Sequence, residues 1–471
     1  MSNLQQPQDS ASGPVPPSQA GAKRKRRLIV GGAAVALALV GVGVAYALGA
    51  FTRGGPQPAS IISADASIYA SIDLNAAPAQ QLLAAQYLVR FPAFRDAKDP
   101  AAVKRILFDG LMPNLTTEPS VDYDTKVKPW LGDRFAVATV SIPGSLMTPV
   151  MVFEVTDQAQ ASQSLEVINA TGRVHCRFIG TFVGCTTQRD ALESVTVTDR
   201  GRSLEASTPF AGDLASVDGS GVGRFWVDTD KVPHSAGPAV LITPLQGRLA
   251  AGIRFTDART LEVQGIIRGQ ASVNTATGTQ ADKLAADTVV AVSINGGADR
   301  VTAEWPAYAA TQTPEDLSRW EAWANLKVPD ELAALVGQHT SLGVLFPPTI
   351  RSPLVAVVTD GDRAVAERVT PPNMPPGQVH TVDGQVVLAD SPEIAQAVVS
   401  GGLAGTPGFL AALPEANIAT FLAYADLASL IAAYERNGDM DLSAVHPLQS
   451  FGLAVTGSGS DRFTARVILK G

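Results

Sequence analysis

The sequence predicts an α+β fold: an N-terminal transmembrane helix is followed by two tandem, similar lobes of mainly antiparallel sheet with flanking helices. Three observations predict this arrangement. They are an apolar run behind a basic cluster, alternating strand patterns separated by short helical stretches, and short motifs that recur in one order at a spacing of about 200 residues. With 471 residues, 46% of them hydrophobic and 17% charged, the chain can build more than one core.

The apolar run covers residues 28–48 and contains no charged residue. At about 1.5 Å per residue, a helix of this length matches the hydrocarbon core of a bilayer. We therefore expect a transmembrane helix over residues 28–49 that contacts the cytoplasmic membrane. Ala45-Tyr46-Ala47 also fits a cleavage site, so a cleaved signal peptide stays open as the alternative to a signal-anchor.

The basic cluster directly before this run predicts its orientation. It consists of Lys23, Arg24, Lys25, Arg26 and Arg27. Because Lys and Arg beside a membrane-spanning segment stay cytoplasmic, everything beyond residue 51 should be extracytoplasmic, in the cell envelope. Residues 1–27, rich in Pro, Ser, Gln and Gly, should form a disordered cytoplasmic tail, and residues 50–58 a linker.

Small residues in the run allow close packing of two such helices. Gly32 with Ala36, and Gly43 with Ala47, have the spacing of helix-dimer motifs, which makes a weak homodimer one expectation. The formal net charge of the chain is −8, although its N-terminal tail is basic. The exported part is therefore acidic, which argues against nucleic acid as a partner.

An internal repeat is predicted beyond residue 58, with lobes at residues 59–275 and 276–471. The matching stretches are 65–72 with 287–294, 130–132 with 335–337, 149–152 with 353–356, 174–176 with 379–381, and 245–246 with 448–449. Five markers in the same order are what a tandem duplication leaves behind. In the first lobe we also expect a helix from Pro78 and another from Asp157, the first with Leu82, Leu83 and Leu88 on its apolar side.

Cys176 and Cys185 are the only cysteines, and we expect them to form a disulfide. Gly180-Thr181 suits a two-residue hairpin turn, which places Cys176 opposite Cys185 in a non-hydrogen-bonded pair. The compartment implied by the anchor is oxidising. A reduced buried pair is the alternative. The matching hairpin at residues 380–389 has Thr381 in the place of Cys176, so it should lack the bond.

No catalytic, cofactor-binding or metal-binding residues are predicted. The histidines are scattered and form neither a His-Glu-x-x-His motif nor a Cys/His cluster, and no serine-hydrolase motif is present. They are His175, His234, His339, His380 and His446. The Asp-x-Asp pairs at residues 122–124, 228–230, 360–362 and 439–441 do not continue as calcium loops and suit turns and helix caps.

Several features together resemble a known family. The features that carry this resemblance are the basic-then-apolar N-terminus, the strand entry at Asp65, the Phe91-Pro92 pair, the motif at residues 130–132 and the duplicated layout. In these features the chain is similar to actinobacterial single-pass envelope proteins of a domain-of-unknown-function family (domain of unknown function 3352). The resemblance implies an envelope location and this architecture. It supplies no activity and no site residues.

The expected function is that of a membrane-anchored, extracytoplasmic protein that binds or scaffolds an unknown envelope protein or ligand. The groove between the lobes or an exposed sheet edge would be the binding surface. An enzyme is not the favoured interpretation. Two alternatives stay open: an envelope hydrolase with a site assembled from distant residues such as His175, His234 or the Asp pairs, and a purely structural envelope protein.

Overall fold

The computed structural model describes most of the chain beyond residue 55. The described residues are 56–95, 100–112, 120–142, 145–217, 221–232, 247–269, 280–310, 312–348, 352–369, 378–436, 438, 441–457 and 462–471. All of them lie in one compact unit, residues 43–471. The expected tail, transmembrane helix and most of the linker lie outside these residues. In the part of the chain that is described, no helix is both long and apolar enough to span a bilayer.

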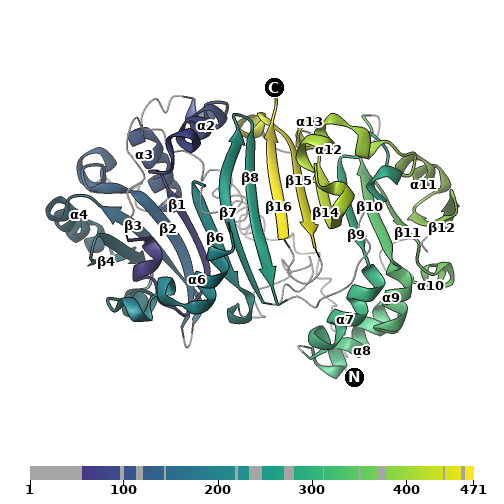
Figure 1. Ribbon diagram of the computed structural model, residues 1–471, viewed down its shortest axis with the longest axis horizontal. Helices are drawn as coiled ribbons and strands as arrows, with labels where there is room; N and C mark the ends of the chain where they lie inside the picture. The colour runs from purple at the N-terminus through teal and green to yellow at the C-terminus, as the bar shows by residue number, and fades with distance from the viewer. Residues whose placement is uncertain are drawn as a thin grey trace, which may run out of the picture. The chain divides into compact units, whose positions relative to one another are not determined.

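Strands and short helices alternate along the chain, as expected for an α+β fold (Figure 1). We call residues 59–275 the first half and residues 276–471 the second half. The strands of the first half are β1 (Ala66–Asp73), β2 (Leu131–Ile142), β3 (Ser145–Val155), β4 (His175–Ile179), β5 (Phe182–Thr186), β6 (Gly223–Asp228), β7 (Arg248–Asp257) and β8 (Thr260–Arg268). Those of the second half are β9 (Val290–Asn295), β10 (His339–Leu345), β11 (Leu354–Thr359), β12 (Gln378–Val382), β13 (Gln385–Ala389), β14 (Ala419–Ala425), β15 (Leu448–Thr456) and β16 (Arg462–Leu469).

The helices are short and connect these strands. In the first half they are α2 (Pro78–Leu88), α3 (Pro100–Leu111), α4 (Gln158–Ala170), α5 (Leu192–Val195) and α6 (Thr208–Ala215), with the short turns η1 (Pro58–Ile61), η5 (Arg200–Arg202) and η7 (Thr229–Lys231). In the second half they are α7 (Gly297–Ala309), α8 (Pro314–Ala324), α9 (Asp330–Val336), α10 (Arg363–Arg368), α11 (Pro392–Val398), α12 (Pro407–Ala412) and α13 (Leu427–Arg436). The start of α4 is as predicted, because the Asp157 carboxylate accepts a hydrogen bond from the backbone N–H of Gln160 at 3.0 Å.

The sixteen strands of the described residues belong to one antiparallel sheet, whose edge strands are β4 and β12. From the centre outward, the first half runs β8-β7-β6-β1-β2-β3-β5-β4, and the second half runs β16-β15-β14-β9-β10-β11-β13-β12. The two orders are the same, strand for strand. The halves meet where β8 pairs with β16, and Glu262 lies opposite Arg466 there. We call this pair of strands the seam.

One face of the sheet, which we call the core face, carries an equivalent aromatic contact in each half. Phe210 of α6 packs edge-on against Trp226 of β6 with ring centroids 5.4 Å apart, and Phe409 of α12 packs against Tyr424 of β14 at 5.2 Å. All four rings are buried. Besides the strands, η1, α5 and α6 contribute to the core of the first half, and α11 and α12 to the core of the second.

The other face, which we call the opposite face, carries Phe135, Phe153 and Phe255 in the first half, where α2 and α3 cover it. One detail of α2 was predicted wrongly. Leu82 is 57% exposed, whereas Gln81 is buried because its side-chain amide donates hydrogen bonds to the carbonyls of Leu74 and Ala76. A buried amide that finds two acceptors can take the place of an apolar side chain.

Charged side chains cross the seam on the core face. The Glu262 carboxylate accepts from Nε of Arg254 and from Nε of Arg466, each at 2.8 Å, and only 4% of this side chain is exposed. Arg466 also donates to Glu415 at 2.6 Å. Burial of Glu415 opposes its ionisation, but the hydrogen bonds and charge of Arg466 outweigh burial and hold the pKa of this carboxyl below its usual value. The cluster therefore joins β7, β8 and β16 electrostatically.

The cysteine hairpin is confirmed. Gly180 has a positive φ of 63°, β4 pairs with β5 so that Cys176 lies opposite Cys185, and the two form a disulfide. In the second half the register differs from the prediction. Counted from the turn, the pair in the equivalent place is Val379 with Leu388, not one that includes Thr381. The repeat motif at residues 379–381 was therefore matched two residues out of register, and an apolar pair stands where the first half has its disulfide.

Candidate functional site

An open pocket of about 570 Å³ lies on the described surface of the first half. It is lined by Ser63, Asp65, Ser141, Ile142, Arg177, Glu193, Ser194, Thr196, Val197, Thr198, Asp199 and Arg202. These residues come from the strand entry before β1, the end of β2, the cysteine hairpin, α5 and the segment that follows it. The pocket lies within one half, whereas the sequence pointed to a groove between lobes or to a sheet edge.

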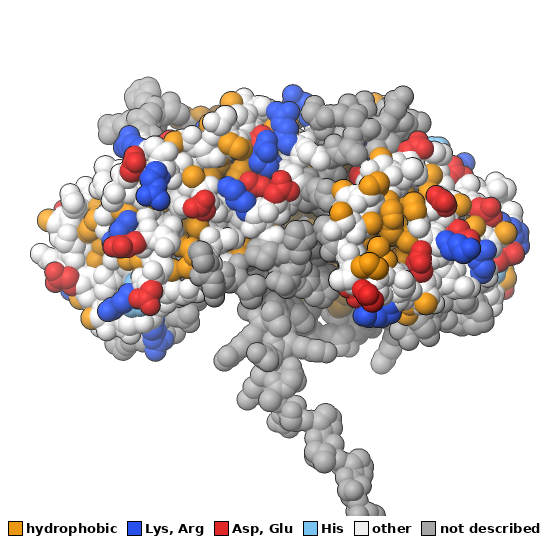
Figure 2. Space-filling model, turned by 90° about the horizontal axis from the view of Figure 1, so that it is seen from below, with side chains coloured by type: hydrophobic (Ala, Val, Ile, Leu, Met, Phe, Trp, Pro, Cys, Tyr) orange, Lys and Arg blue, Asp and Glu red, His pale blue; other side chains and the backbone are white. Residues whose placement is uncertain are grey.

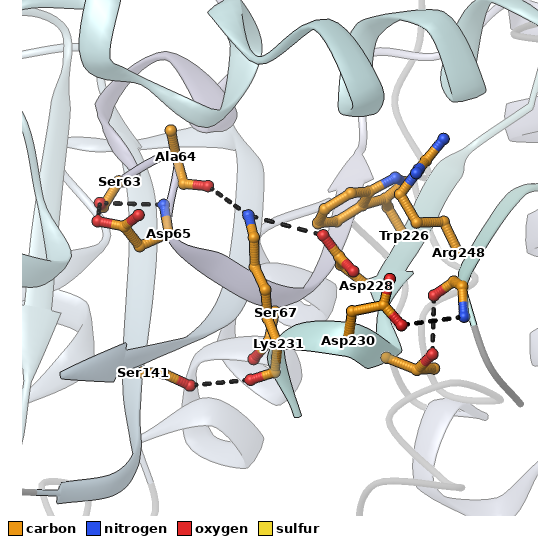
Figure 3. Close-up of polar contacts among 12 residues, drawn as sticks. Ser63, Ala64, Asp65, Ser67, Ser141, Trp226, Asp228, Asp230, Lys231 and Arg248 are labelled. Carbon is orange, nitrogen blue, oxygen red and sulfur yellow. Dashed lines mark hydrogen bonds and ion pairs between the residues drawn. The ribbon is translucent and has the colours of Figure 1, made fainter. Parts of the chain in front are cut away.

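The strand entry forms one wall and is held by backbone bonds. The N–H of Ser63 donates to Val195 O at 3.1 Å, and the N–H of Ala64 donates to Arg202 O at 3.0 Å. Within the turn, the N–H of Asp65 donates to Oγ of Ser63 at 3.2 Å, and that hydroxyl lies 3.3 Å from the Asp65 carboxylate (Figure 3). The turn therefore fixes a hydroxyl and a carboxylate side by side at the pocket wall.

Lys231 of η7 supports this wall from behind, as Figure 3 shows. Its ammonium donates to Ala64 O at 2.8 Å, lies 3.7 Å from the Asp228 carboxylate, and sits 5.9 Å from the centre of the Trp226 ring. The carbonyl of Lys231 accepts from Oγ of Ser141 at 3.1 Å. Through these contacts, one residue connects the strand entry, the end of β2 and the aromatic core.

Arg177 forms the opposite wall and is held rigidly. Its Nε donates to Oγ1 of Thr196 at 2.9 Å and its Nη2 donates to Thr196 O at 3.1 Å. Thr196 is fully buried, and a Cβ on Gly184, the cross-strand neighbour of Arg177, would lie only 2.6 Å from its methyl group. The disulfide closes the hairpin one residue away from Arg177. The predicted disulfide therefore supports the strand that presents this guanidinium to the pocket.

The charges around the pocket are mixed. Asp65, Glu193 and Asp199 provide carboxylates, and Arg177 and Arg202 provide guanidinium groups. Arg202 is exposed, and so is Arg200, which lies two residues earlier on η5 and does not line the pocket. Ser63, Ser141 and Ser194 add hydroxyl groups to the lining. Such a lining can offer hydrogen-bond donors and acceptors to a polar ligand at the same time.

A smaller pocket of about 240 Å³ adjoins the core face between η1 and α6. The ring of Tyr69 lies at its base, and burial raises the pKa of this phenol to about 12. Tyr69 therefore stays neutral at physiological pH and acts as a hydrogen-bonding core residue.

The histidines are not brought together. The side chains of His339 and His446 pair with the carboxylates of Asp360 at 2.7 Å and of Glu435 at 2.6 Å. His175 begins β4, and Nε2 of His380 on β12 is buried without a hydrogen-bond partner. Because of the register described above, His175 and His380 do not occupy equivalent places. His234 lies outside the described residues, and within the described ranges no histidine side chain hydrogen-bonds a hydroxyl group.

The Asp-x-Asp pairs serve as caps and ion-pair partners. Asp122 caps the turn at Tyr123–Val127, and its hydrogen bonds from Thr125 hold its pKa below the usual value. Asp362 caps α10, and Asp124 pairs with Arg105 at 2.9 Å. Asp439 lies outside the described residues. Among the residues whose positions are described, no group of three or more His, Cys, Asp or Glu side chains could hold a metal ion.

The comparison with protein families gives one match. A family model described as "Protein of unknown function (DUF3352)" matches residues 29–177, which is less than half of the chain. The match supports the domain-of-unknown-function family that the sequence resembles, and it includes the apolar run, the strand entry and Arg177 of the pocket. No curated protein matches the chain significantly. The family description states no activity.

Proposed function

We propose that the chain is a single-pass membrane protein whose region beyond residue 51 is extracytoplasmic, and that it binds or scaffolds a polar component of the cell envelope through the pocket in its first half. The disulfide between Cys176 and Cys185 is the observation that carries the proposal. Disulfides persist in oxidising compartments, and the apolar run behind five basic residues provides a route to one. The bond and the orientation rule therefore point to the same side of the membrane.

The organisation of the two halves is part of this proposal. Tandem duplication of one α+β unit is supported by the identical strand order and by the Phe-on-aromatic contact that α6 and α12 each make with the core face. The pocket belongs to the first half, whose hairpin carries the disulfide. The second half has Val379 and Leu388 in that place. Because the two halves differ at this wall of the pocket, we propose that the first half alone is specialised for binding.

Protease protection tests the orientation. A protease added outside cells from which the outer envelope layers have been removed should digest the chain beyond residue 51 and leave an N-terminal tag on the tail intact. The tail lies behind the basic cluster, which should hold it in the cytoplasm. Detergent permeabilisation is the control and should expose both parts. Digestion of the tail with protection of the remainder would contradict the proposed topology.

Photo-crosslinking in intact cells tests the pocket. A photoreactive residue at Ser194, an exposed pocket residue, should yield a discrete adduct with an envelope component. Arg202→Glu reverses an exposed charge at the pocket and should reduce this adduct by about tenfold, since a lost charge-assisted hydrogen bond is worth about 1.5 to 3 kcal/mol. Arg200→Glu is the matched control and should leave the yield unchanged. Failure to recover any adduct, or equal effects of the two reversals, would refute the pocket as the binding site.

A further inference from the structure

The smaller pocket, of about 240 Å³ between η1 and α6, combines an apolar base with two charged groups. At its base, the rings of Tyr69 and Phe210 meet edge-on with their centroids 5.3 Å apart, and both side chains are buried. Leu214 of α6 extends this apolar surface. The charged groups are those of Arg224 on β6 and Glu205 on η6 (Leu204–Ala206), and both residues are exposed. The pocket therefore offers an apolar surface beside one charge of each sign.

Neither charge has a partner on the protein. Within the described ranges, the side chains of Arg224 and Glu205 make no hydrogen bond and no ion pair, either with each other or with other residues. Both lie near the phenol of Tyr69, because its pKa, which burial raises, is also lowered by the charge of Arg224 and raised by that of Glu205. On the face that Figure 2 shows, by contrast, most Lys and Arg side chains lie beside Asp or Glu side chains. The two unpaired charges are therefore available to a ligand that carries both signs of charge.

The equivalent position in the second half belongs to the core. Trp226 of β6 and Tyr424 of β14 hold equivalent places, as their contacts with the phenylalanines of α6 and α12 show. Two residues earlier, on the same face of these strands, lie Arg224 and Leu422, each opposite a serine of the neighbouring strand. Leu422 is fully buried. A charge on the core face is costly to desolvate unless a partner compensates it, so the arginine and the pocket beside it together point to a bound anionic group.

We infer that the smaller pocket is a second binding site of this chain and that it takes a free apolar α-amino acid. The carboxylate of the ligand binds Arg224, its ammonium group faces Glu205, and its side chain packs against Tyr69, Phe210 and Leu214. A guanidinium holds a carboxylate by charge-assisted hydrogen bonds, and an apolar lining with a few polar groups fixes the orientation of a small ligand.

The size and place of the pocket agree with this ligand. Sites for drug-sized molecules usually measure about 300 to 1,000 Å³, so a pocket of about 240 Å³ suits a smaller molecule such as leucine. The site shares no lining residue with the larger pocket. Binding at the smaller pocket is therefore independent of the function proposed above for the larger one.

Isothermal titration calorimetry of the full-length protein in detergent tests the inference with four probes. L-leucine should bind. N-acetyl-L-leucine lacks the ammonium group, L-leucinamide lacks the carboxylate, and glycine lacks the apolar side chain. Each of these three should bind at least about tenfold more weakly than leucine, because each has lost one of the three interactions.

Two substitutions assign the charges. Arg224→Leu, which copies the second half, should weaken the binding of leucine and of N-acetyl-leucine by about tenfold or more, because both ligands carry the carboxylate. Glu205→Gln should weaken the binding of leucine and leave that of N-acetyl-leucine unchanged. The matched control is Arg462→Leu, which replaces another exposed arginine on the core face, opposite Ile266, and should leave both affinities unchanged.

A third substitution blocks the pocket without altering a charge. Ala211→Trp enlarges an exposed lining residue and should abolish leucine binding, whereas Ala206→Trp, at an exposed position outside the pocket, should not. Absence of leucine binding at millimolar concentration would overturn the inference, as would unchanged leucine binding in Arg224→Leu or Ala211→Trp. Equal affinities for leucine and glycine, or for leucine and N-acetyl-leucine, would equally refute an apolar amino acid as the ligand.

Discussion

Arg466→Ala should lower the free energy of unfolding by about 3 to 5 kcal/mol, the usual cost of removing one partner from a buried ion cluster. Arg466 connects the two halves electrostatically, because it binds Glu262 across the seam and Glu415 beside it. Without it, Glu262 stays buried with Arg254 as its remaining cationic partner. The loss arises chiefly from the desolvated carboxylate left behind. Urea denaturation measures it.

The control for this prediction lies on the same strand. Arg462 of β16 is exposed, so Arg462→Ala should change the free energy of unfolding by less than about 1 kcal/mol. A double-mutant cycle with Glu415→Ala would separate the Arg466–Glu415 interaction from the contact with Glu262. Equal effects of Arg466→Ala and Arg462→Ala would show that the cluster does not stabilise the seam.

Cys176→Ser should lower the free energy of unfolding by about 2 to 3 kcal/mol under oxidising conditions, since a disulfide that closes a loop of ten residues removes about that much chain entropy from the unfolded state. The hairpin also holds Arg177 at the pocket wall, so the variant should lose crosslinking from Ser194 as well. Thermal melting with and without reductant measures the effect on stability.

Reductant supplies the internal control for the disulfide. The parent protein should melt at a lower temperature when reduced, and Cys176→Ser should be insensitive to reductant. If the parent protein melts at the same temperature in both conditions, the bond contributes nothing to stability.

Local features of the fold were predictable from the sequence. The Gly180 turn and the start of α4 depend on neighbours along the chain, so the cross-strand cysteine pair was found at the expected residues and α4 begins one residue after Asp157. The recurrence of motifs indicated two similar units. The register of the second hairpin was missed. Val379-His380-Thr381 resembles Val174-His175-Cys176 in amino-acid sequence, but the two segments lie at different distances from their hairpin turns.

Long-range features could not be predicted in the same way. No hydrophobic pattern shows that β8 pairs with β16, because apolar and polar residues alternate in the same way in an edge strand and in a central strand. The pocket was missed for a related reason: its residues come from distant segments that meet through bridges such as Ile62 with Thr196 and Ser63 with Ser203. One overlooked sequence signal was the Thr-Pro step just before Phe210 and Phe409, which marks the equivalent helices α6 and α12.

Under the duplication proposed above, the pairing at the seam has an evolutionary consequence. β8 and β16 hold the same position in their halves and run antiparallel, so two copies of one unit placed in this way are related by a two-fold axis perpendicular to the sheet. A half-length ancestor would have had β8 as an unpaired edge strand, and such a strand readily pairs with the same strand of a second copy. Such an ancestor would have existed as a homodimer, and gene fusion would have turned its subunit contact into the middle of a single polypeptide.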